Sequence, residues 1–203
     1  MSPLVGRALE SLGYDRAYSL TPASSVARVP SWDDSFAWDG EALSTIRPVV
    51  VDVGAAGKGY LVDIVAELLA DAGISEYIVD ASGDMLHAGP TAAHVALEHP
   101  RDPSMAIGVA SLQNASLCAS ASNRRTWGPG LHHIIDAASG IPTSDVIATW
   151  AIAPTALEAD GLATALFFTD PERLAAVADF AFVRMFSTGR VDHSANFTGE
   201  LFV

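Results

Sequence analysis

Residues 146–165 have the sequence VIATWAIAPTALEADGLATA, which combines a strand pattern with a helix start signal. Residues 146–153 form an apolar run of strand length that contains β-branched side chains. After Pro154, the hydroxyl of Thr155 precedes the carboxylate of Glu158 by three residues, which is the spacing of a helix capping box. We therefore predict a strand over 146–153 and a buried helix over 156–168.

Two oxygen-bearing side chains, Asp160 and Thr164, are four residues apart on this predicted helix. They would share one helix face, because residues at this spacing lie one above the other. A carboxylate and a hydroxyl are hard donors that suit Mg²⁺. Alternatively, Asp160 is a favourable negative charge near a helix N-terminus and Thr164 fills the core. The spacing alone favours this second interpretation.

A glycine-rich segment, DVGAAGKGY over residues 52–60, follows a β-branched run over 48–53 and precedes a helical apolar pattern over 59–72. These features predict a strand, a tight turn and a helix that stops at Gly73. The spacing fits neither a P-loop nor the three-glycine dinucleotide fingerprint. Phosphate binding by open backbone N–H groups and a purely structural turn both remain as interpretations.

The remaining segments predict short elements separated by turn residues. We expect short helices over 3–12 and 171–180, irregular structure over 19–44, and strands over 77–79, 85–87, 94–97, 106–110, 117–120, 132–135 and 183–186. The predicted fold class is α+β, with a mixed, largely antiparallel sheet and helices packed on it. A single domain is expected over residues 1–203.

Composition limits the classes of partner. The chain has 203 residues, half of them hydrophobic, and a formal net charge of −13 with only 11 Lys and Arg, which argues against nucleic-acid binding. A single cysteine, Cys118, excludes an intrachain disulfide and is expected in the core. No secretory signal pattern and no apolar run of membrane-spanning length is present, so we expect a cytoplasmic protein without a membrane span.

Three further polar segments have both a structural and a functional interpretation. The turn at 80–84 ends in Asp84, whose carboxylate would contact a hydroxyl-rich ligand or cap its own backbone. On a strand over 132–135, only one of His132 and His133 would face a site, and a strand histidine is more often structural than catalytic. The pair Arg124 and Arg125 would meet phosphate or solvate a loop.

Taken in order, these segments resemble the FAD:protein FMN transferase (flavin transferase, ApbE) family. The family's Asp-Leu-Gly-Gly-Ile-Ala-Lys-Gly-Tyr segment resembles Asp52–Tyr60, with a further aspartate at Asp63, and its Gly-Gly-Asp turn resembles Ser82–Asp84. Its Ser-His-Ile-Ile-Asp-Pro-x-Thr-Gly-x-Pro segment resembles His132–Pro142. Its Ala-Pro-Thr-Ala-x-Glu-Ala-Asp-Ala-Leu-Ala-Thr-Ala segment matches Ala153–Ala165 almost throughout. Four ordered motifs are more specific than any one of them.

The resemblance implies an ApbE-like (T-fold-like) fold and Mg-dependent transfer of FMN from FAD to a threonine hydroxyl of a target protein, with release of AMP. Asp160 and Thr164, with the backbone carbonyl of Gly57, would hold Mg²⁺, and His133 would act as the acid or base. FAD and an acceptor protein with a threonine-containing motif are the implied partners. The implied FAD-binding residues are Gly54, Lys58, Tyr60, Asp84, His133 and Ile134.

The sequence departs from the family pattern at several positions. Ser82 replaces a usual glycine, Asp80 replaces an asparagine, and residues 120–125 lack an aspartate and a tyrosine of the family's Ser-Gly-Asp-Tyr-Arg-Arg stretch. Residues 2–6 resemble an internal family segment, so the N-terminal part of the family is expected to be missing. Two alternatives to an active transferase follow: a non-catalytic FAD-binding remnant, and a hydrolase that converts FAD to FMN and AMP.

Overall fold

The computed structural model describes residues 2–202. The chain divides into two compact units. The first comprises the residues up to Val53 together with Arg124–Thr143, and the second comprises Gly54–Asn123 together with the residues from Ser144 onward. Each unit is described by itself below. The single domain expected over 1–203 stays a prediction.

The first unit contains a short helix, a hairpin and a small core of its own. Helix α1 (Gly6–Ser11) is followed by Leu12 and by Gly13 at φ +95°, which agrees with the predicted short helix and its glycine stop. The hairpin consists of β1 (Phe36–Trp38) and β2 (Leu43–Thr45). The core includes Trp127, whose indole Nε1 donates to the Leu12 carbonyl at 2.8 Å.

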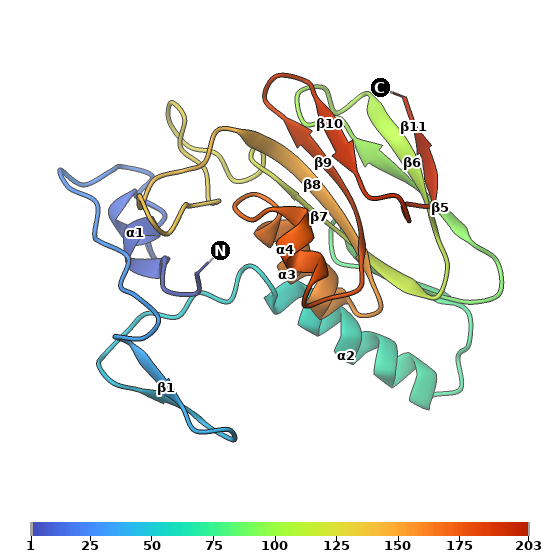
Figure 1. Ribbon diagram of the computed structural model, residues 1–203, viewed down its shortest axis with the longest axis horizontal. Coiled ribbons are helices and arrows are strands. Elements are labelled where there is room, and N and C mark those ends of the chain that lie inside the picture. The colour runs from blue at the N-terminus through green and yellow to red at the C-terminus, as the bar shows by residue number, and fades with distance from the viewer. Residues whose placement is uncertain (1, 203) are drawn as a thin grey trace. The chain divides into compact units, whose positions relative to one another are not determined.

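The second unit contains two sheets and three helices among the described residues (Figure 1). The six-stranded sheet has the order β10-β9-β8-β7-β4-β3, and the three-stranded sheet has the order β11-β6-β5. The helices are α2 (Gly57–Asp71), α3 (Ala156–Ala165) and α4 (Pro171–Ala175). The strands are β3 (Tyr77–Asp80), β4 (Asp84–Ala88), β5 (Ala93–Glu98), β6 (Ala106–Leu112), β7 (Ala115–Ala121), β8 (Val146–Ala153), β9 (Ala181–Phe186), β10 (Val191–His193) and β11 (Gly199–Leu201).

Strand β8 lies between two hydrophobic layers, which explains its continuous apolar sequence. Ala151 and Ala153 pack with α2 and α3 on one face of the six-stranded sheet. Trp150, which points the opposite way, packs with Leu97 and Ile107 of the three-stranded sheet on the other face. The second unit is therefore a three-layer structure of helices, large sheet and small sheet. Every strand pairing among the described residues is antiparallel, which confirms the predicted α+β class.

Several sequence predictions were wrong. Residues 48–53 form no strand, because their β-branched side chains have no partner strand; the Asp52 amide donates instead to the Pro3 carbonyl at 2.7 Å. Residues 132–135 form only isolated bridges, Thr126 with His132 and Ile135 with Pro142, rather than a strand. The hairpin β1–β2 lies in the segment predicted as irregular, and β10 and β11 were not predicted. Helix α4 is also shorter than the predicted 171–180.

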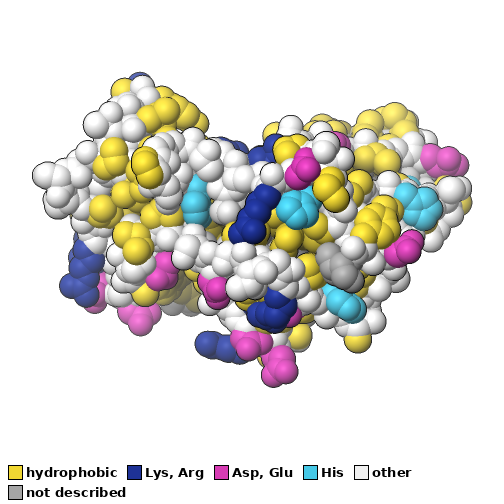
Figure 2. Space-filling view, turned by 90° about the horizontal axis from the view of Figure 1, so that it is seen from above, with side chains coloured by type: hydrophobic (Ala, Val, Ile, Leu, Met, Phe, Trp, Pro, Cys, Tyr) yellow, Lys and Arg dark blue, Asp and Glu magenta, His cyan; other side chains and the backbone are white. Residues whose placement is uncertain are grey.

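On the face that Figure 2 shows, Lys and Arg side chains are scattered among acidic and uncharged residues. No helix within residues 2–202 is long and apolar enough to cross a membrane.

Helices α2 and α3 approach each other closely at Gly59. A Cβ atom at this position would lie 2.1 Å from the Ala156 carbonyl oxygen and 2.9 Å from the Asp160 Cβ. Any side chain would therefore push the two helices apart. Gly161 is also helical, but a Cβ there would meet open space.

This difference predicts opposite effects of two glycine substitutions. Gly59→Ala should lower the free energy of unfolding by roughly 1–3 kcal/mol, because the helices must separate. Gly161→Ala should raise it by roughly 0.5–1 kcal/mol, because alanine favours the helix and meets no neighbour. Urea denaturation of both variants and the parent chain measures the change. A Gly59→Ala variant as stable as the parent chain would contradict the close crossing.

Candidate functional site

Asp160 and Thr164 are buried on the face of α3 that packs against the rest of the second unit. Their exposed fractions are only 3% and 5%. Asp160 Oδ2 accepts a hydrogen bond from the Gly59 amide of α2 at 3.0 Å, and Thr164 Oγ1 lies 3.3 Å from the hydroxyl oxygen of Ser120 on β7. The N-cap half of the predicted capping box is present, since the Glu158 amide donates to Thr155 Oγ1 at 3.2 Å, while the Glu158 carboxylate accepts from the Thr155 hydroxyl. The helix prediction is thus confirmed at its start.

This donor set fits magnesium in its chemistry. Asp160 and Thr164 offer a carboxylate and a hydroxyl, and Gly57 begins the neighbouring helix two residues before Gly59. No group of three or more His, Cys, Asp or Glu suited to a metal occurs within residues 2–202. A zinc-type cluster is therefore absent there. Hard oxygen donors supplemented by backbone carbonyls and ligand oxygens are the coordination that Mg²⁺ prefers.

A buried ion pair joins the start of α2 to the large sheet. Lys58, the only lysine in the chain, donates to Asp84 Oδ2. The Asp84 side chain is fully buried, whereas 38% of the Lys58 side chain is exposed. The second carboxylate oxygen of Asp84 is buried and has no hydrogen-bond partner among the described residues. Lys58 is therefore the cation that offsets the burial of Asp84, and its exposed portion faces solvent.

Cys118 lies between this ion pair and α3. It is paired across the sheet with Asp84, and its thiol donates to the Ala156 carbonyl at 3.5 Å. Burial raises the pKa of the Cys118 thiol, and the nearby carboxylates of Asp84 and Asp160 raise it further. Cys118 is therefore a neutral core residue, as predicted, and both carboxylates belong to one region of the second unit.

The turn before β4 adopts a conformation that favours glycine. Ser82 has φ +61° and Gly83 has φ +97°, and the Gly83 amide donates to Asp80 Oδ1 at 2.9 Å. Ser82 occupies the position where the family pattern has glycine, so the family residue suits this backbone better than serine does. Asp80 caps the turn, and Asp84 is left to pair with Lys58.

The two adjacent histidines of the first unit have different environments. His132 is buried; its Nε2 lies 2.8 Å from the Thr143 carbonyl, and its Nδ1 accepts from the Ile134 amide at 3.3 Å. Both ring nitrogens are thus used in holding the loop. His133 is partly exposed, and its Nδ1 lies 3.1 Å from the Arg124 carbonyl. A hydrogen bond to this carbonyl, which only accepts, corresponds to the tautomer with the proton on Nδ1.

The structure brings most of the predicted site residues together in the second unit. Gly54 lies in the turn before α2, and Tyr60, in its first turn, is 57% exposed. Their companions in this unit are Gly57, Lys58, Asp84, Asp160 and Thr164. His133 and Ile134 belong to the first unit. The Ile134 side chain is 1% exposed, and its amide and carbonyl are hydrogen-bonded to His132 and Thr143.

Sequence reasoning gave no role to Ser120, and it mentioned Asp63 only as part of a motif. Ser120 contacts Thr164 Oγ1, and the two carboxylate oxygens of Asp63 accept from the backbone of α3. The spacing of Asp63, four residues after Gly59 on the same helix, was the signal that could have placed both residues on one helix face. No local pattern around Ser120 pointed to α3.

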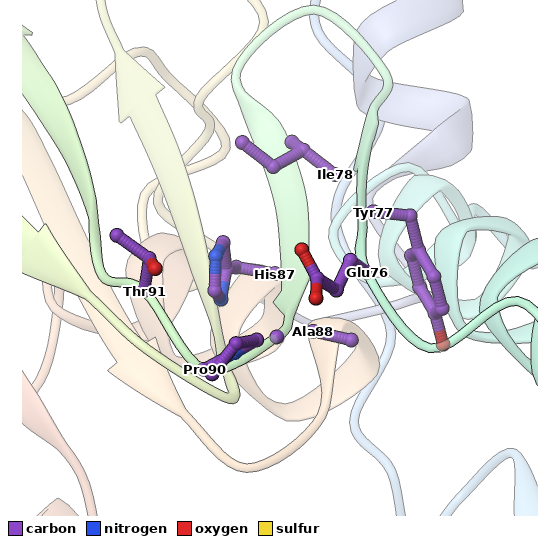
Figure 3. A pocket seen from close by; sticks show the side chains of 8 residues that line it. Glu76, Tyr77, Ile78, His87, Ala88, Pro90 and Thr91 are labelled. Carbon is purple, nitrogen blue, oxygen red and sulfur yellow. The ribbon is translucent and has the colours of Figure 1, made fainter.

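One cavity of about 280 Å³ lies elsewhere in the second unit, at the hairpin of β3 and β4. Figure 3 shows the side chains of Glu76 and His87 projecting toward the same space. The lining residues are Glu76, Tyr77, Ile78, His87, Ala88, Gly89, Pro90 and Thr91. None of them is a predicted site residue. The buried donors at the α2–α3 crossing, and not this cavity, are the chemically specific feature.

The sequence model described as the ApbE family matches residues 7–184. The chain belongs to the ApbE family. Among its relatives are two proteins named FAD:protein FMN transferase. That of Klebsiella pneumoniae (strain 342) is 33% identical over 137 residues, which cover 63% of this chain and 39% of the relative. That of Escherichia coli (strain K12) is 33% identical over 132 residues, covering 61% and 38%. The chain thus matches about two fifths of the length of these curated relatives.

Solved ApbE structures share the fold. The ApbE protein of Thermotoga maritima superposes with a TM-score of 0.77 at 23% identity and covers 96% of this chain and 69% of that one. The flavin transferase ApbE of Vibrio cholerae superposes with a TM-score of 0.71 at 20% identity and covers 96% and 68%. The predicted ApbE-like architecture is therefore confirmed.

The ion pair of Lys58 and Asp84 predicts a strong dependence of stability on the lysine charge. Lys58→Met keeps the aliphatic stem but leaves the buried Asp84 carboxylate without its cation. The free energy of unfolding should fall by about 1–3 kcal/mol, less than for a fully buried pair because Lys58 is partly exposed. Asp84→Asn added to Lys58→Met should recover part of the loss. Chemical denaturation of the two single variants and the double variant gives the coupling, and additive losses would contradict it.

The environment of His132 predicts a loss of stability in acid. Burial lowers the pKa of His132 below its ordinary value of 6.5, and the hydrogen bond to Thr143 offsets only part of this. The unfolded chain therefore binds the proton more readily, so the free energy of unfolding falls as the pH drops below about 6.5. His132→Gln should make the decrease between pH 7.5 and pH 5.5 smaller. His94→Gln, at an exposed histidine, is the matched control and should leave the decrease unchanged.

Proposed function

We propose that this chain transfers FMN from FAD to a threonine hydroxyl of a partner protein and releases AMP. The observation that supports this most directly is the pair Asp160 and Thr164, buried on one face of α3 inside a segment that matches the family motif. The names of the relatives support the same reaction class. The threonine hydroxyl oxygen would form a bond to the FMN phosphorus, and the bond from that phosphorus to the bridging pyrophosphate oxygen would break, so that AMP leaves with this oxygen.

Asp160, Thr164 and the Gly57 carbonyl would hold Mg²⁺ in this reaction. When bound, the ion supplies positive charge that offsets the negative charge of the pyrophosphate. Asp160 contributes the anionic oxygen, and Thr164 contributes a hydroxyl oxygen whose orientation is restrained by Ser120. Because α3 and β7 are rigid elements, these oxygens need little reorganisation to receive a ligand.

Backbone and side-chain groups at the start of α2 would bind the flavin nucleotide. The turn before α2 has little side-chain bulk at Gly54 and Gly57, and the N-terminus of a helix attracts phosphate. Lys58 would add the one lysine charge of the chain, held in place by Asp84. The ring of Tyr60 is exposed and would cover an aromatic ligand. These groups explain how a strongly acidic chain would bind a dianionic nucleotide.

His133 would accept the proton of the attacking threonine hydroxyl. The hydrogen bond from Nδ1 to the Arg124 carbonyl favours the tautomer whose Nε2 carries the lone pair. His132, by contrast, is buried and holds the loop through hydrogen bonds of both ring nitrogens.

The reaction predicts a metal-dependent mass increment on an acceptor peptide. The chain is incubated with FAD, Mg²⁺ and a peptide that carries an Asp-Gly-x-Thr sequence, and the peptide is weighed by mass spectrometry. Asp160→Asn, which removes the charge but keeps the size, should slow the transfer by about a hundredfold or more. Glu158→Gln, an exposed carboxylate in the same helix, is the control and should transfer at the parent rate.

Other results of this assay would identify one of the two alternative functions. Free FMN and AMP without a labelled peptide would indicate a hydrolase. FAD binding without either product would indicate a non-catalytic remnant. The proposal fails if Asp160→Asn transfers FMN as fast as the parent chain.

The uniqueness of Lys58 allows a direct test of nucleotide binding. An amine-acylating reagent should label Lys58 and the α-amino group, and FAD with Mg²⁺ should protect Lys58 selectively. The α-amino group serves as the internal control for reagent strength. Peptide mass spectrometry reports both labels, and equal labelling of Lys58 with and without FAD would place the nucleotide elsewhere.

A further inference from the structure

Helices α2 and α3 cap each other's first turn. The N-cap residue of α2, Ala56, makes no side-chain capping hydrogen bond. The Gly59 amide in this first turn donates instead to Asp160 Oδ2 of α3 at 3.0 Å. In return, the amides of Ala156 and Leu157 in the first turn of α3 donate to the two carboxylate oxygens of Asp63 on α2, each at 2.8 Å. Each helix thus supplies an aspartate to the N-terminus of the other.

The Asp63 bonds are more than an ordinary helix cap. Thr155 already caps α3 locally through the Glu158 amide. The two amides bound by Asp63 are additional, and they are donors that a helix start leaves without an intrahelical partner. Because Asp63 belongs to α2, these bonds fix α3 against α2 at a defined register. The close approach of Gly59 to the Ala156 carbonyl leaves no space for a side chain at this crossing.

This register matters because the proposed metal donors are divided between the two helices. Gly57 lies at the start of α2, whereas Asp160 and Thr164 lie on α3. Productive coordination requires donors placed within about half an ångström of their positions. A relative shift of the helices would move the Gly57 carbonyl away from Asp160 while leaving each helix intact.

We propose that Asp63 is a positioning residue for the metal site: it fixes the crossing of α2 and α3 and thereby the placement of Asp160 against the first turn of α2. This inference rests on the proposed function, because it assumes that these residues hold Mg²⁺. Asp63 itself binds the backbone of α3 and is not a ligand. Its negative charge at the N-terminus of α3 is also favoured by the helix dipole.

The test compares metal affinity in variants that differ at Asp63. Asp63→Asn keeps the size and one acceptor oxygen but presents an NH₂ group to a backbone N–H, so one bond is lost and the chain still folds. Glu67→Gln makes the same charge change one turn further along α2, on its exposed side, and is the matched control. Asp160→Asn reports the metal site itself. Mn²⁺, as a spectroscopic substitute for Mg²⁺, is titrated into each protein and the free ion is measured by electron paramagnetic resonance.

We expect Asp63→Asn to weaken Mn²⁺ binding by about 10- to 100-fold, as is typical of residues that orient metal ligands. Glu67→Gln should bind like the parent chain. In transfer assays, Asp63→Asn should raise the Mg²⁺ concentration for half-maximal rate, with a smaller effect on the rate at saturating Mg²⁺. A residue with a stabilising role alone would lower the unfolding free energy without this shift.

A second measurement does not depend on the metal. Hydrogen exchange of the Gly59 amide, followed by NMR, reports its bond to Asp160. Asp63→Asn should increase the exchange rate of Gly59 by about tenfold or more, because the helix crossing loosens locally. In Glu67→Gln the rate should not change.

The outcomes distinguish the two proposals. If Asp160→Asn abolishes Mn²⁺ binding but Asp63→Asn binds like Glu67→Gln, the metal site stands and the positioning role is overturned. If the parent chain and Asp160→Asn bind Mn²⁺ equally, the proposed metal site is wrong. In that case faster exchange of Gly59 in Asp63→Asn would retain Asp63 as the residue that sets the helix crossing, and unchanged exchange would remove that role also.

Discussion

The crossing of α2 and α3 is the constraint on which the candidate site depends. At Gly59 the backbone of α2 touches the Ala156 carbonyl, and two aspartates bind across the contact in opposite directions. A helix start has unpaired N–H groups, and burying them without acceptors is costly. Here each start is satisfied by the other helix. Asp63 and Asp160 therefore stabilise the packing of the two helices at the candidate site.

The same region contains buried negative charge in a chain whose net charge is already −13. Asp84 and Asp160 are both buried near Cys118, and two buried carboxylates need compensating positive charge. Lys58 provides it for Asp84, and the amide of the α2 N-terminus provides part of it for Asp160. Stability and the proposed nucleotide chemistry thus use the same charges.

Family membership agrees with the local structure, and the departures from the family pattern have physical meaning. Ser82 stands at a positive φ where the family pattern has glycine, so this turn carries strain that glycine would relieve. The turn nevertheless places Asp84 at the start of β4, opposite Cys118. A substitution that strains the backbone without moving the buried carboxylate leaves the ion pair with Lys58 intact.

The sequence by itself determined the elements whose signals are local. The capping box at Thr155 fixed the start of α3, and the apolar run over 146–153 identified β8, because both patterns reflect hydrogen bonds or burial within a few residues. The glycine-rich turn and the apolar periodicity after it located α2. The spacing of Asp160 and Thr164 correctly placed both on one helix face. The metal site at this pair stays a prediction that rests on the family resemblance.

Only the tertiary structure decided which residues meet across long sequence separations. Residues 48–53 and 132–135 have strand-like sequences but lack strand partners. A strand forms only where an adjacent strand can hydrogen-bond to its backbone. The bond of Gly59 to Asp160 spans 101 residues, and that of Asp63 to Ala156 spans 93. No local pattern encodes such pairs. In each, an aspartate side chain accepts from a backbone amide of the other helix, and the two helices meet only because both pack on the same sheet.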